Sequence, residues 1–511
     1  MRAILSTAAI LGVTTAACAS ELPKSSLEKL PASQKVIADG LEGPKKQHGK
    51  SGAQVRKSPT VNKERRSANA APVTKGPKAA LDDSLTWHGL TLYGQVDAGL
   101  TYLSHGAPLS PTAGTGVNYL IARNSNRSYF GLGANGFAGS FIGLKGKQDV
   151  ADDVAAIFKL ETAFNPQSGL LSDGPGSIVQ NNGVPIDRQN SFADSSKAGQ
   201  AFNVAAYAGL SSPTYGTLTY GRQAALTSEA VVAYDPMASA SAFSVIGFQG
   251  ATGGGGDTEN RILDNSLKYA ASFGNVRGAV QAQVGSGPNA GPRNAVQAQL
   301  GGGYLGLSVD AIFSQINGAI SASPLPFPLP NGLPTNIGNG LVAGTISDNT
   351  SYMLVAKYAI GSFKFFGGYE HIQFANPKTP LSPGDTIAGG YVLGTVANNS
   401  FTTDRVLQIF WTGATYEARP DLDLKFAYYH EEQNSYHGAP GSSFNAGRCS
   451  NASLAQCSGQ LDALSFLMDY KYSKHLDMYA GIMWSQVSNG LASGFLQRST
   501  IDPTVGLRYR F

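Results

Sequence analysis

The chain has 511 residues and a formal net charge of +4, with only 14% charged residues but 62 Gly, 22 Tyr and 23 Phe. This composition indicates a β-rich chain with many turns and few surface charges. Beyond a short N-terminal run, no apolar stretch approaches the roughly 20 residues that a helix needs to cross a bilayer, so any crossing of a membrane must use the strands of a closed barrel.

The first predicted element is an export signal at residues 1–19. Arg2 precedes an apolar core at residues 3–13, and the small-residue sequence Ala17-Cys18-Ala19 supplies a cleavage site. The mature chain is therefore expected to begin near residue 20. A second interpretation makes Cys18 the lipidated residue of a lipoprotein, but Thr15 stands where such sites usually carry an aliphatic residue.

Residues 20–84 are predicted to form a basic, disordered tail. They hold 13 Lys and Arg against 7 Asp and Glu and show no sustained hydrophobic period. Low hydrophobicity with an excess of one charge predicts disorder. Such a tail either binds anionic polymers or stays solvated. Nucleic acid is not an expected partner, because the chain is exported and no aromatic residues interleave with the basic ones.

From residue 85 onward the sequence alternates between apolar and polar side chains. In residues 90–102 one parity includes Leu92 and Leu100, and the other includes Thr91 and Asp97. Because successive side chains of a strand point to opposite faces, this segment is predicted to be a strand with one apolar and one polar surface. The same alternation recurs in residues 422–429, 464–472 and 505–511.

Sixteen strands are predicted, joined by alternating long and short connections. The predicted strands are 89–103, 138–148, 152–164, 202–211, 215–222, 262–273, 275–285, 293–302, 304–316, 350–360, 362–375, 403–416, 421–433, 460–473, 475–488 and 501–511. Short turns include Gly274 and Gly361, and long connections include residues 104–137, 223–261 and 434–459. Outer-membrane barrels have short periplasmic turns and longer outer loops.

The pattern therefore predicts that residues 85–511 form an all-β, 16-stranded antiparallel transmembrane β-barrel. An even strand count places the N- and C-termini on the same, periplasmic side. The polar parity would face a lumen, and the apolar parity, with its Tyr and Phe, would face lipid and its interfaces. A barrel of this size is wide enough to hold a water-filled channel.

The longest connection near the C-terminal end contains Cys449 and Cys457. Because the chain is exported to an oxidising compartment, these two residues are predicted to form a disulfide. Two solvent-facing free thiols are the alternative. A metal site is not expected, since no His residues cluster with them.

Several stretches match a known family. They are LYGQVDAG at residues 92–99, GLKG at 143–146, FKLE at 158–161, YGTLTYGRQ at 215–223 and the closing VGLRYRF at 505–511. Over residues 90–511, their order and spacing resemble the trimeric general porins of Gram-negative bacteria, which end on an aromatic residue. The likeness does not extend to the tail.

The resemblance implies that the third long loop, at residues 223–261, folds into the lumen and faces a ladder of basic side chains. The candidate residues of the pore and its constriction are Asp97, Phe141, Lys145, Lys159, Glu161, Val204, Arg222, Glu229, Asp235, Asp257, Glu259, Arg261 and Lys364. Phe141 and Val204 stand where the family usually carries wall arginines, so strong anion selectivity is not expected. Lys145, Lys159 and Lys364 either replace that charge or are ordinary solvated residues of the lumen.

The function that the resemblance implies is passive diffusion of small hydrophilic solutes and ions through an outer-membrane homotrimer. Its partners would be outer-membrane lipids and lipopolysaccharide, and no cofactor is expected. The alternative is a channel specific for sugars or small organic acids, which Phe141 and the proline-rich loop at residues 324–330 would suit.

Two other classes are disfavoured. For an enzyme, the candidate pairs are Glu370 with His371 and Glu431 with His430, but neighbouring residues of a strand point to opposite faces. No nucleophile-elbow, zinc-protease or phosphate-loop motif is present in the sequence, so no enzymatic activity is expected. A soluble or adhesive β-protein is disfavoured, because Tyr- and Phe-rich faces recur strand after strand.

Overall fold

The computed structural model describes residues 85–106, 127–169, 171, 201–246, 261–283, 294–323, 342–381, 387–388, 391–438, 458–492 and 497–511. All of them belong to one compact unit, Lys78–Phe511. The predicted export signal, the tail and both Cys449 and Cys457 lie outside the described residues, so those predictions remain open.

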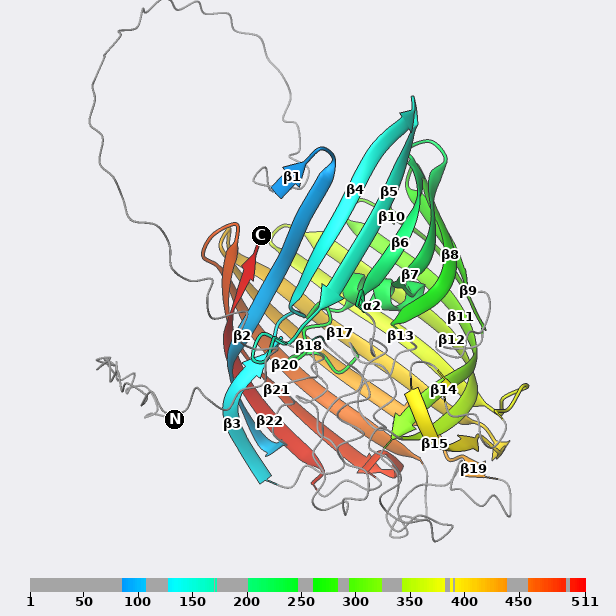
Figure 1. The fold of residues 1–511 in the computed structure, drawn as a ribbon. Helices are drawn as coiled ribbons and strands as arrows, with labels where there is room; N and C mark the ends of the chain where they lie inside the picture. The colour runs from blue at the N-terminus through cyan, green and yellow to red at the C-terminus, as the bar shows by residue number, and fades with distance from the viewer. Residues whose placement is uncertain are drawn as a thin grey trace, which may run out of the picture. The chain divides into compact units, whose positions relative to one another are not determined.

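The described residues form the predicted closed barrel of 16 wall strands, each antiparallel to its neighbours (Figure 1). β2 and β22 close the barrel, with pairs running from Gln95↔Arg510 to Thr101↔Thr504. The wall strands are β2 (Leu90–Gly106), β3 (Arg127–Ala134) with β4 (Phe141–Ala151) as one interrupted strand, β5 (Val154–Ala163), β6 (Ala205–Ser212), β7 (Gly216–Ala224), β8 (Ile262–Phe273), β9 (Val276–Gln283), β10 (Asn294–Tyr304), β11 (Leu307–Ser323), β12 (Val342–Ile360), β13 (Phe363–Ala375), β17 (Arg405–Arg419), β18 (Leu422–Gln433), β20 (Gly459–Lys471), β21 (Leu476–Asn489) and β22 (Ser499–Arg510).

Several shorter elements lie outside the predicted set. β1 (Leu85–Trp87) pairs with the start of β2, and β15 (Tyr391–Asn398) pairs with β12 in parallel and with β14 (Ile387–Ala388). β16 (Phe401–Thr403) and β19 (His437–Gly438) pair with each other, and a 3-10 turn, η6 (Gly490–Ala492), follows β21. The prediction that residues 104–137 are all loop is wrong for residues 127–134, because these form β3 and pair with β2 in the wall.

The predicted turns have a simple backbone cause. β8 and β9 are joined through Gly274 (φ +59°), and β12 and β13 through Gly361 (φ +55°). Left-handed backbone at a tight turn costs glycine little, because it has no Cβ.

The two faces of the wall follow the predicted parity. Leu100, Tyr102, Phe466 and Leu507 are exposed on the outward face, whereas their inward neighbours such as Thr101 are buried. Outward apolar side chains are the surface that a bilayer would cover. In the described part of the chain, no helix combines the length and apolarity needed to span a membrane.

The third loop folds into the barrel, as expected. After β7, the chain enters α2 (Leu226–Tyr234) and continues through residues 235–246 inside the wall (Figure 1). We call residues 225–246 the inner loop. Its apolar side chains and the inward side chains of β11, β12, β13, β17, β18, β20 and β21 form the largest buried apolar cluster. We call that inward surface the covered wall.

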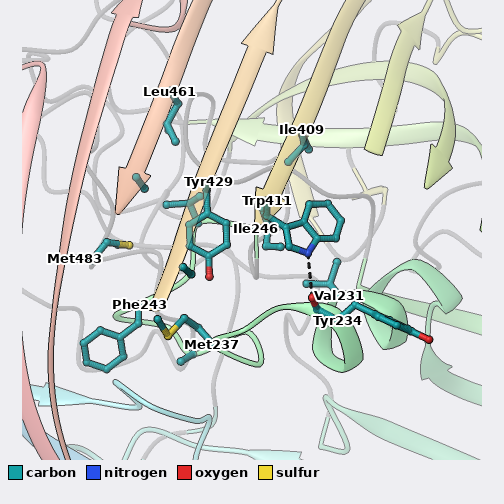
Figure 2. Packing of buried hydrophobic residues seen from close by; sticks show 14 of the residues in the cluster. Val231, Tyr234, Met237, Phe243, Ile246, Ile409, Trp411, Tyr429, Leu461 and Met483 are labelled. Atoms are coloured by element: carbon teal, nitrogen blue, oxygen red, sulfur yellow. Dashed lines mark hydrogen bonds between the residues drawn. The ribbon is translucent and has the colours of Figure 1, made fainter. Parts of the chain in front are cut away.

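The covered wall corrects one expectation from the sequence, that the inward parity is polar throughout. Ile409, Trp411, Leu467 and Met483 all point inward and are at most 3% exposed. They belong to the buried apolar cluster that includes the inner loop, and Figure 2 shows Trp411 directly over α2. The core of this barrel therefore lies inside its lumen.

Candidate functional site

The first turn of α2 is fixed to the wall at mid-barrel. The Leu226 amide donates to Gln297 Oε1 of β10 at 2.7 Å, and the Ala225 amide donates to the Arg261 carbonyl at 3.0 Å. Both bonds satisfy amides that a helix start leaves without partners. Leu226, Ala230, Val231 and Tyr234 are buried, whereas Glu229 and Val232 are exposed. The helix therefore presents one apolar face to the wall and the other to the open part of the lumen.

The last turn of α2 is held by a network around Tyr234. Its hydroxyl contacts Asp310 and Ser308, and Arg277 donates to the same hydroxyl at 2.6 Å. Trp411 Nε1 donates to the Tyr234 carbonyl at 3.1 Å, the bond drawn in Figure 2. Since these partners come from β9, β11 and β17, they position the end of the helix from both sides.

Lys357 of β12 adds a third attachment to α2. Its Nζ donates to the Ala233 carbonyl at 3.1 Å and lies 4.8 Å from the centre of the Tyr234 ring. A cation is favourable at a helix C-terminus and over an aromatic face. The lysine thus holds the helix end without a carboxylate partner in the described part of the barrel.

Asp235 ends the helix and is only 2% exposed. Its carboxylate accepts hydrogen bonds from the Tyr429 hydroxyl at 2.6 Å, the Met237 amide at 3.1 Å and the Ser239 amide at 2.8 Å. Burial raises the pKa of Asp235 above its ordinary value, against these hydrogen bonds. Asp235, expected as a constriction charge, is buried as an anchor of the inner loop.

Two glycines of the covered wall let the inner loop approach closely. A Cβ on Gly413 would lie 2.6 Å from the Pro236 ring, and a Cβ on Gly481 would lie 2.6 Å from the Phe243 ring. Neither distance leaves room for a side chain. Pro236 therefore packs against the backbone of Gly413, and Phe243 packs against the backbone of Gly481.

The opposite surface, formed by the inward faces of β4, β5 and β6 with Tyr93 of β2, is not covered in this way, and we call it the uncovered wall. The Tyr93 hydroxyl donates to Glu161 at 2.9 Å, and Lys159 pairs with the same carboxylate at 2.9 Å. Lys145 lies 5.1 Å from the centre of the Tyr93 ring, and the Phe141 ring meets that ring edge-on at 5.8 Å. The surface combines aromatic rings with charge.

Tyr207 of β6 is part of the uncovered wall and is partly buried. This tyrosine is close enough to interact electrostatically with Lys159 and Glu161 of the wall and with Glu229 of α2. Glu229 pairs with Lys268 of β8 at 2.7 Å, and the Glu229 side chain is half exposed.

Most other charges of the lumen wall are paired within the described strands. The pairs are Arg222 with Asp264, Arg277 with Asp310, Lys425 with Asp469, Lys471 with Asp423, and both Arg508 and Arg510 with Asp477. Each pairing brings the two signs together on one wall. A strong one-sided ladder of bases is therefore not what the described strands present.

The remaining predicted residues fall in several environments. Asp97 is fully buried and accepts bonds from Tyr479 and two backbone amides, and Arg222 is buried and donates to the Asn203 carbonyl. Arg261 is half-buried beside Ala225, and Lys364 is exposed on β13.

Val204 precedes β6 and shares the parity of the outward Ala208 and Leu210, so it lies off the inward face. Asp257 and Glu259 lie outside the described residues.

The histidine pairs considered for an enzyme lie on opposite faces of the wall, as parity predicted. Glu370 is buried inward and accepts from Ser351 at 2.7 Å, while His371 neighbours Tyr352 outside. His430 contacts Asp462 at 2.8 Å on the outward face. Within the described residues, no group of three or more His, Cys, Asp or Glu side chains is arranged to hold a metal ion.

Sequence reasoning missed the residues that hold the inner loop: Arg277, Lys357, Trp411 and Tyr429. A signal was present, because β20 reads Leu464-Ser465-Phe466-Leu467-Met468, with apolar residues on both parities. Strands buried on both faces show such runs. In this barrel the run marks the covered wall.

Comparison with known proteins agrees with this geometry. A family model of Gram-negative porins matches residues 67–490. An outer membrane porin protein of Bordetella pertussis is 28% identical over 148 residues, which are 29% of this chain and 31% of that protein. The aligned segment thus spans about a third of that relative.

Solved structures share the fold at low sequence identity. An anion-selective porin from Comamonas acidovorans has a TM-score of 0.52 and 16% identity, covering 83% of this chain and 99% of that one. OmpT of Vibrio cholerae has a TM-score of 0.48 and 13% identity, covering 84% and 100%. The first of these likenesses supports the barrel fold alone.

Proposed function

Because the chain belongs to the Gram-negative porin family, we propose that it forms a water-filled channel in the outer membrane for passive diffusion. Small hydrophilic solutes and ions would pass between the exposed face of α2 and the uncovered wall. One observation supports this route above others: α2 buries its apolar face and leaves Glu229 exposed opposite a charged wall. A lumen bordered by polar groups favours hydrated solutes over apolar ones.

The proposed channel has a weak charge preference. Lys159 with Glu161, and Lys268 with Glu229, place opposite charges side by side along the proposed route. Paired charges largely cancel beyond a few ångströms, and physiological salt screens what remains over about 8 Å. Lys145 has no carboxylate partner within the described residues, which favours a small preference for anions.

Purified full-length protein in a planar bilayer tests this proposal. Stepwise conductance is expected. Under a tenfold salt gradient, the reversal potential should be close to zero, with the sign of a slightly higher permeability for anions than for cations. A protein that inserts but gives no conductance steps would contradict the channel.

The second candidate function is a channel specific for small organic acids with an aromatic ring. Tyr93 and Phe141 offer ring faces or edges, and the Lys145 ammonium lies beside them as a partner for a carboxylate. Liposome swelling separates the two candidates. A specific channel would admit benzoate faster than acetate, despite its larger size, whereas a general one would rank solutes by size.

Assembly and orientation complete the proposal. We infer a homotrimer that contacts lipid and lipopolysaccharide, with both chain ends on the periplasmic side and the basic tail there. The outward apolar faces and the terminal strands β2 and β22, which meet at the barrel seam, support this arrangement. Native gel electrophoresis before and after heating tests the trimer, and protease added to whole cells tests the side on which the tail lies.

A further inference from the structure

The second wall strand contains an insertion that the first strand does not match. Ala98 pairs with Ala134 at the end of β3, and Gln95 pairs with Phe141 at the start of β4. Three steps along β2 therefore correspond to seven steps along its partner, an excess of four residues. We call residues 135–140 the strand insertion. These residues leave the hydrogen-bonded pairing with β2 after β3, and the pairing resumes at β4 without a break in the barrel wall.

The strand insertion is closed by a set of buried hydrogen bonds. The Phe137 and Ala138 amides donate to one oxygen of Asp97, at 3.0 and 2.7 Å. The Ser140 amide donates to Asn135 Oδ1 at 2.7 Å, and Asn135 takes the left-handed backbone conformation, with φ +60°. Non-glycine residues adopt this conformation rarely, and Asn is among those that do so most readily. The insertion is thus a defined turn, held by buried hydrogen bonds inside the barrel.

Phe137 of the strand insertion is only 5% exposed, because it is buried among inward side chains of the wall. Arg508 lies 4.0 Å from the centre of its ring and Lys425 lies 4.8 Å from it. Tyr479 meets the ring edge-on at 5.3 Å and donates its hydroxyl to the second oxygen of Asp97 at 2.6 Å. Two cations and an aromatic edge therefore hold one ring, from β18, β21 and β22.

The strand insertion also contacts the far end of the inner loop. The Ala242 amide donates to the Gly136 carbonyl at 2.8 Å. Phe243 packs edge-on against the same Tyr479, at 6.2 Å, and sits over Gly481. Phe137, Tyr479 and Phe243 thus form one aromatic row that joins the strand insertion to the inner loop.

We propose that the strand insertion is a second inward element that clamps the far end of the inner loop and sets the width of the pore, with Phe137 as its size-determining residue. The proposal rests on the proposed function, since a pore width has meaning only in a conducting channel. α2 is fixed by β9–β17 at the near end, while Ala242 and Phe243 are held by the insertion and β21. A loop held at both ends keeps one position across the lumen.

The main experiment compares Phe137→Ala with the unchanged protein in full-length form. The expected result is a higher single-channel conductance, noisier open current, and a larger size limit for neutral sugars in liposome swelling. Phe130→Ala is the matched control, because Phe130 lies on the adjacent β3 but points outward, 71% exposed. It should leave conductance and size limit unchanged.

A second measurement separates clamping from simple removal of a ring from the lumen. In Phe137→Ala, amide hydrogen exchange should quicken at Ala242 and Phe243 but stay unchanged at Val231 and Asp235, which other strands hold. If conductance, size limit and exchange all equal those of the unchanged protein, the clamp is wrong. If Phe137→Ala does not assemble, Phe137→Leu decides by the same readouts, since it keeps an apolar side chain but no ring.

The two proposals fail in different ways. Absence of conductance in the unchanged protein would overturn the channel itself. If the unchanged protein conducts and Phe137→Ala has the same conductance, size limit and hydrogen exchange, the clamp is overturned and the channel is not.

Discussion

The covered and uncovered walls are parts of one barrel, but the inward side chains of the first are mostly apolar and those of the second include charged residues. On the covered wall, Trp411, Tyr429 and Leu467 are buried against the inner loop. On the uncovered wall, Lys145 and Lys159 point into the same lumen beside Tyr93. Inward parity therefore does not decide polarity; what decides it is whether protein or water fills the space in front of the strand.

This difference also separates stability from passage. Apolar burial is the dominant favourable term in folding, and in this barrel the inner loop supplies it inside the lumen. Charges on the uncovered wall contribute little to folding, because the attraction between Lys159 and the buried Glu161 is largely offset by the cost of removing the carboxylate from water. The covered wall is thus expected to control the stability of the loop, and the uncovered wall the solutes.

The largest expected effect comes from Trp411→Ala. It removes a buried ring and the bond to the Tyr234 carbonyl, so the free energy of unfolding should fall by about 3 to 5 kcal/mol. Urea titration in detergent, followed by tryptophan fluorescence and gel mobility, measures the change. Phe141→Ala on the uncovered wall should cost about 1 kcal/mol. Equal losses would mean that the two walls do not differ.

Gly481→Ala should act on the position of the loop. The new Cβ would meet both the Phe243 ring and the Phe466 carbonyl oxygen at 2.6 Å, and overpacking of this kind costs about 1 to 3 kcal/mol. We expect lower stability and a noisier open current. Gly367→Ala is the control, because a Cβ there has no neighbour nearer than 3.8 Å. Unchanged current in Gly481→Ala would show that Phe243 can move at no cost to the loop.

Lys145→Glu should change passage without changing stability. Two unit charges 4 Å apart in water interact by about 1 kcal/mol, so the ratio of anion to cation permeability should fall by up to about fivefold. The reversal potential under a salt gradient measures this ratio. Lys145→Arg keeps the charge and should leave the potential unchanged. If the reversal potential shifts by the same amount in Lys145→Glu and Lys145→Arg, the charge of residue 145 does not cause the change in permeability.

The smallest expected effect concerns pH at Asp235. Burial raises the pKa of this carboxyl, so the folded protein binds a proton more readily than the unfolded chain. The free energy of unfolding should therefore rise as pH falls from neutral toward the ordinary Asp pKa of about 3.9. Asp235→Asn should lack this part of the slope. Urea titrations of both proteins at pH 7 and pH 5 give the comparison, and parallel slopes would contradict it.

Much of the fold could be predicted from the sequence because it depends on local patterns. Alternation and glycine turns such as Gly274 depend only on residues that are adjacent in the sequence. These local patterns predicted the number of wall strands correctly. β3 was missed because Tyr129-Phe130-Gly131-Leu132-Gly133 is rich in glycine and weak in alternation. Its pairing with β2 depends on a register that no local pattern specifies.

The candidate site was less predictable, for a physical reason. Asp235 looks like any loop acid in the sequence, and its bond to the wall comes from Tyr429, 194 residues away. Gly413 and Gly481 look like ordinary strand glycines in the sequence, which does not show that Pro236 and Phe243 pack over them. Contacts at such separations depend on closure of the barrel. Local residue types therefore gave the family and the wall, but not the docking of the loop.

The attachment of the inner loop also fixes an order of assembly. The bonds from Trp411 and Tyr429 join residues 177 and 194 positions apart, and that from Tyr479 to Asp97 spans 382. Contacts between distant residues form late, because closing long loops costs entropy before any contact repays it. The part of the docking surface that Trp411 and Tyr429 supply is complete only when β17 and β18 have joined the sheet, whereas α2 also contacts β9, β10 and β12. We therefore expect α2 to dock first and residues 235–246 to dock last, when the barrel is complete.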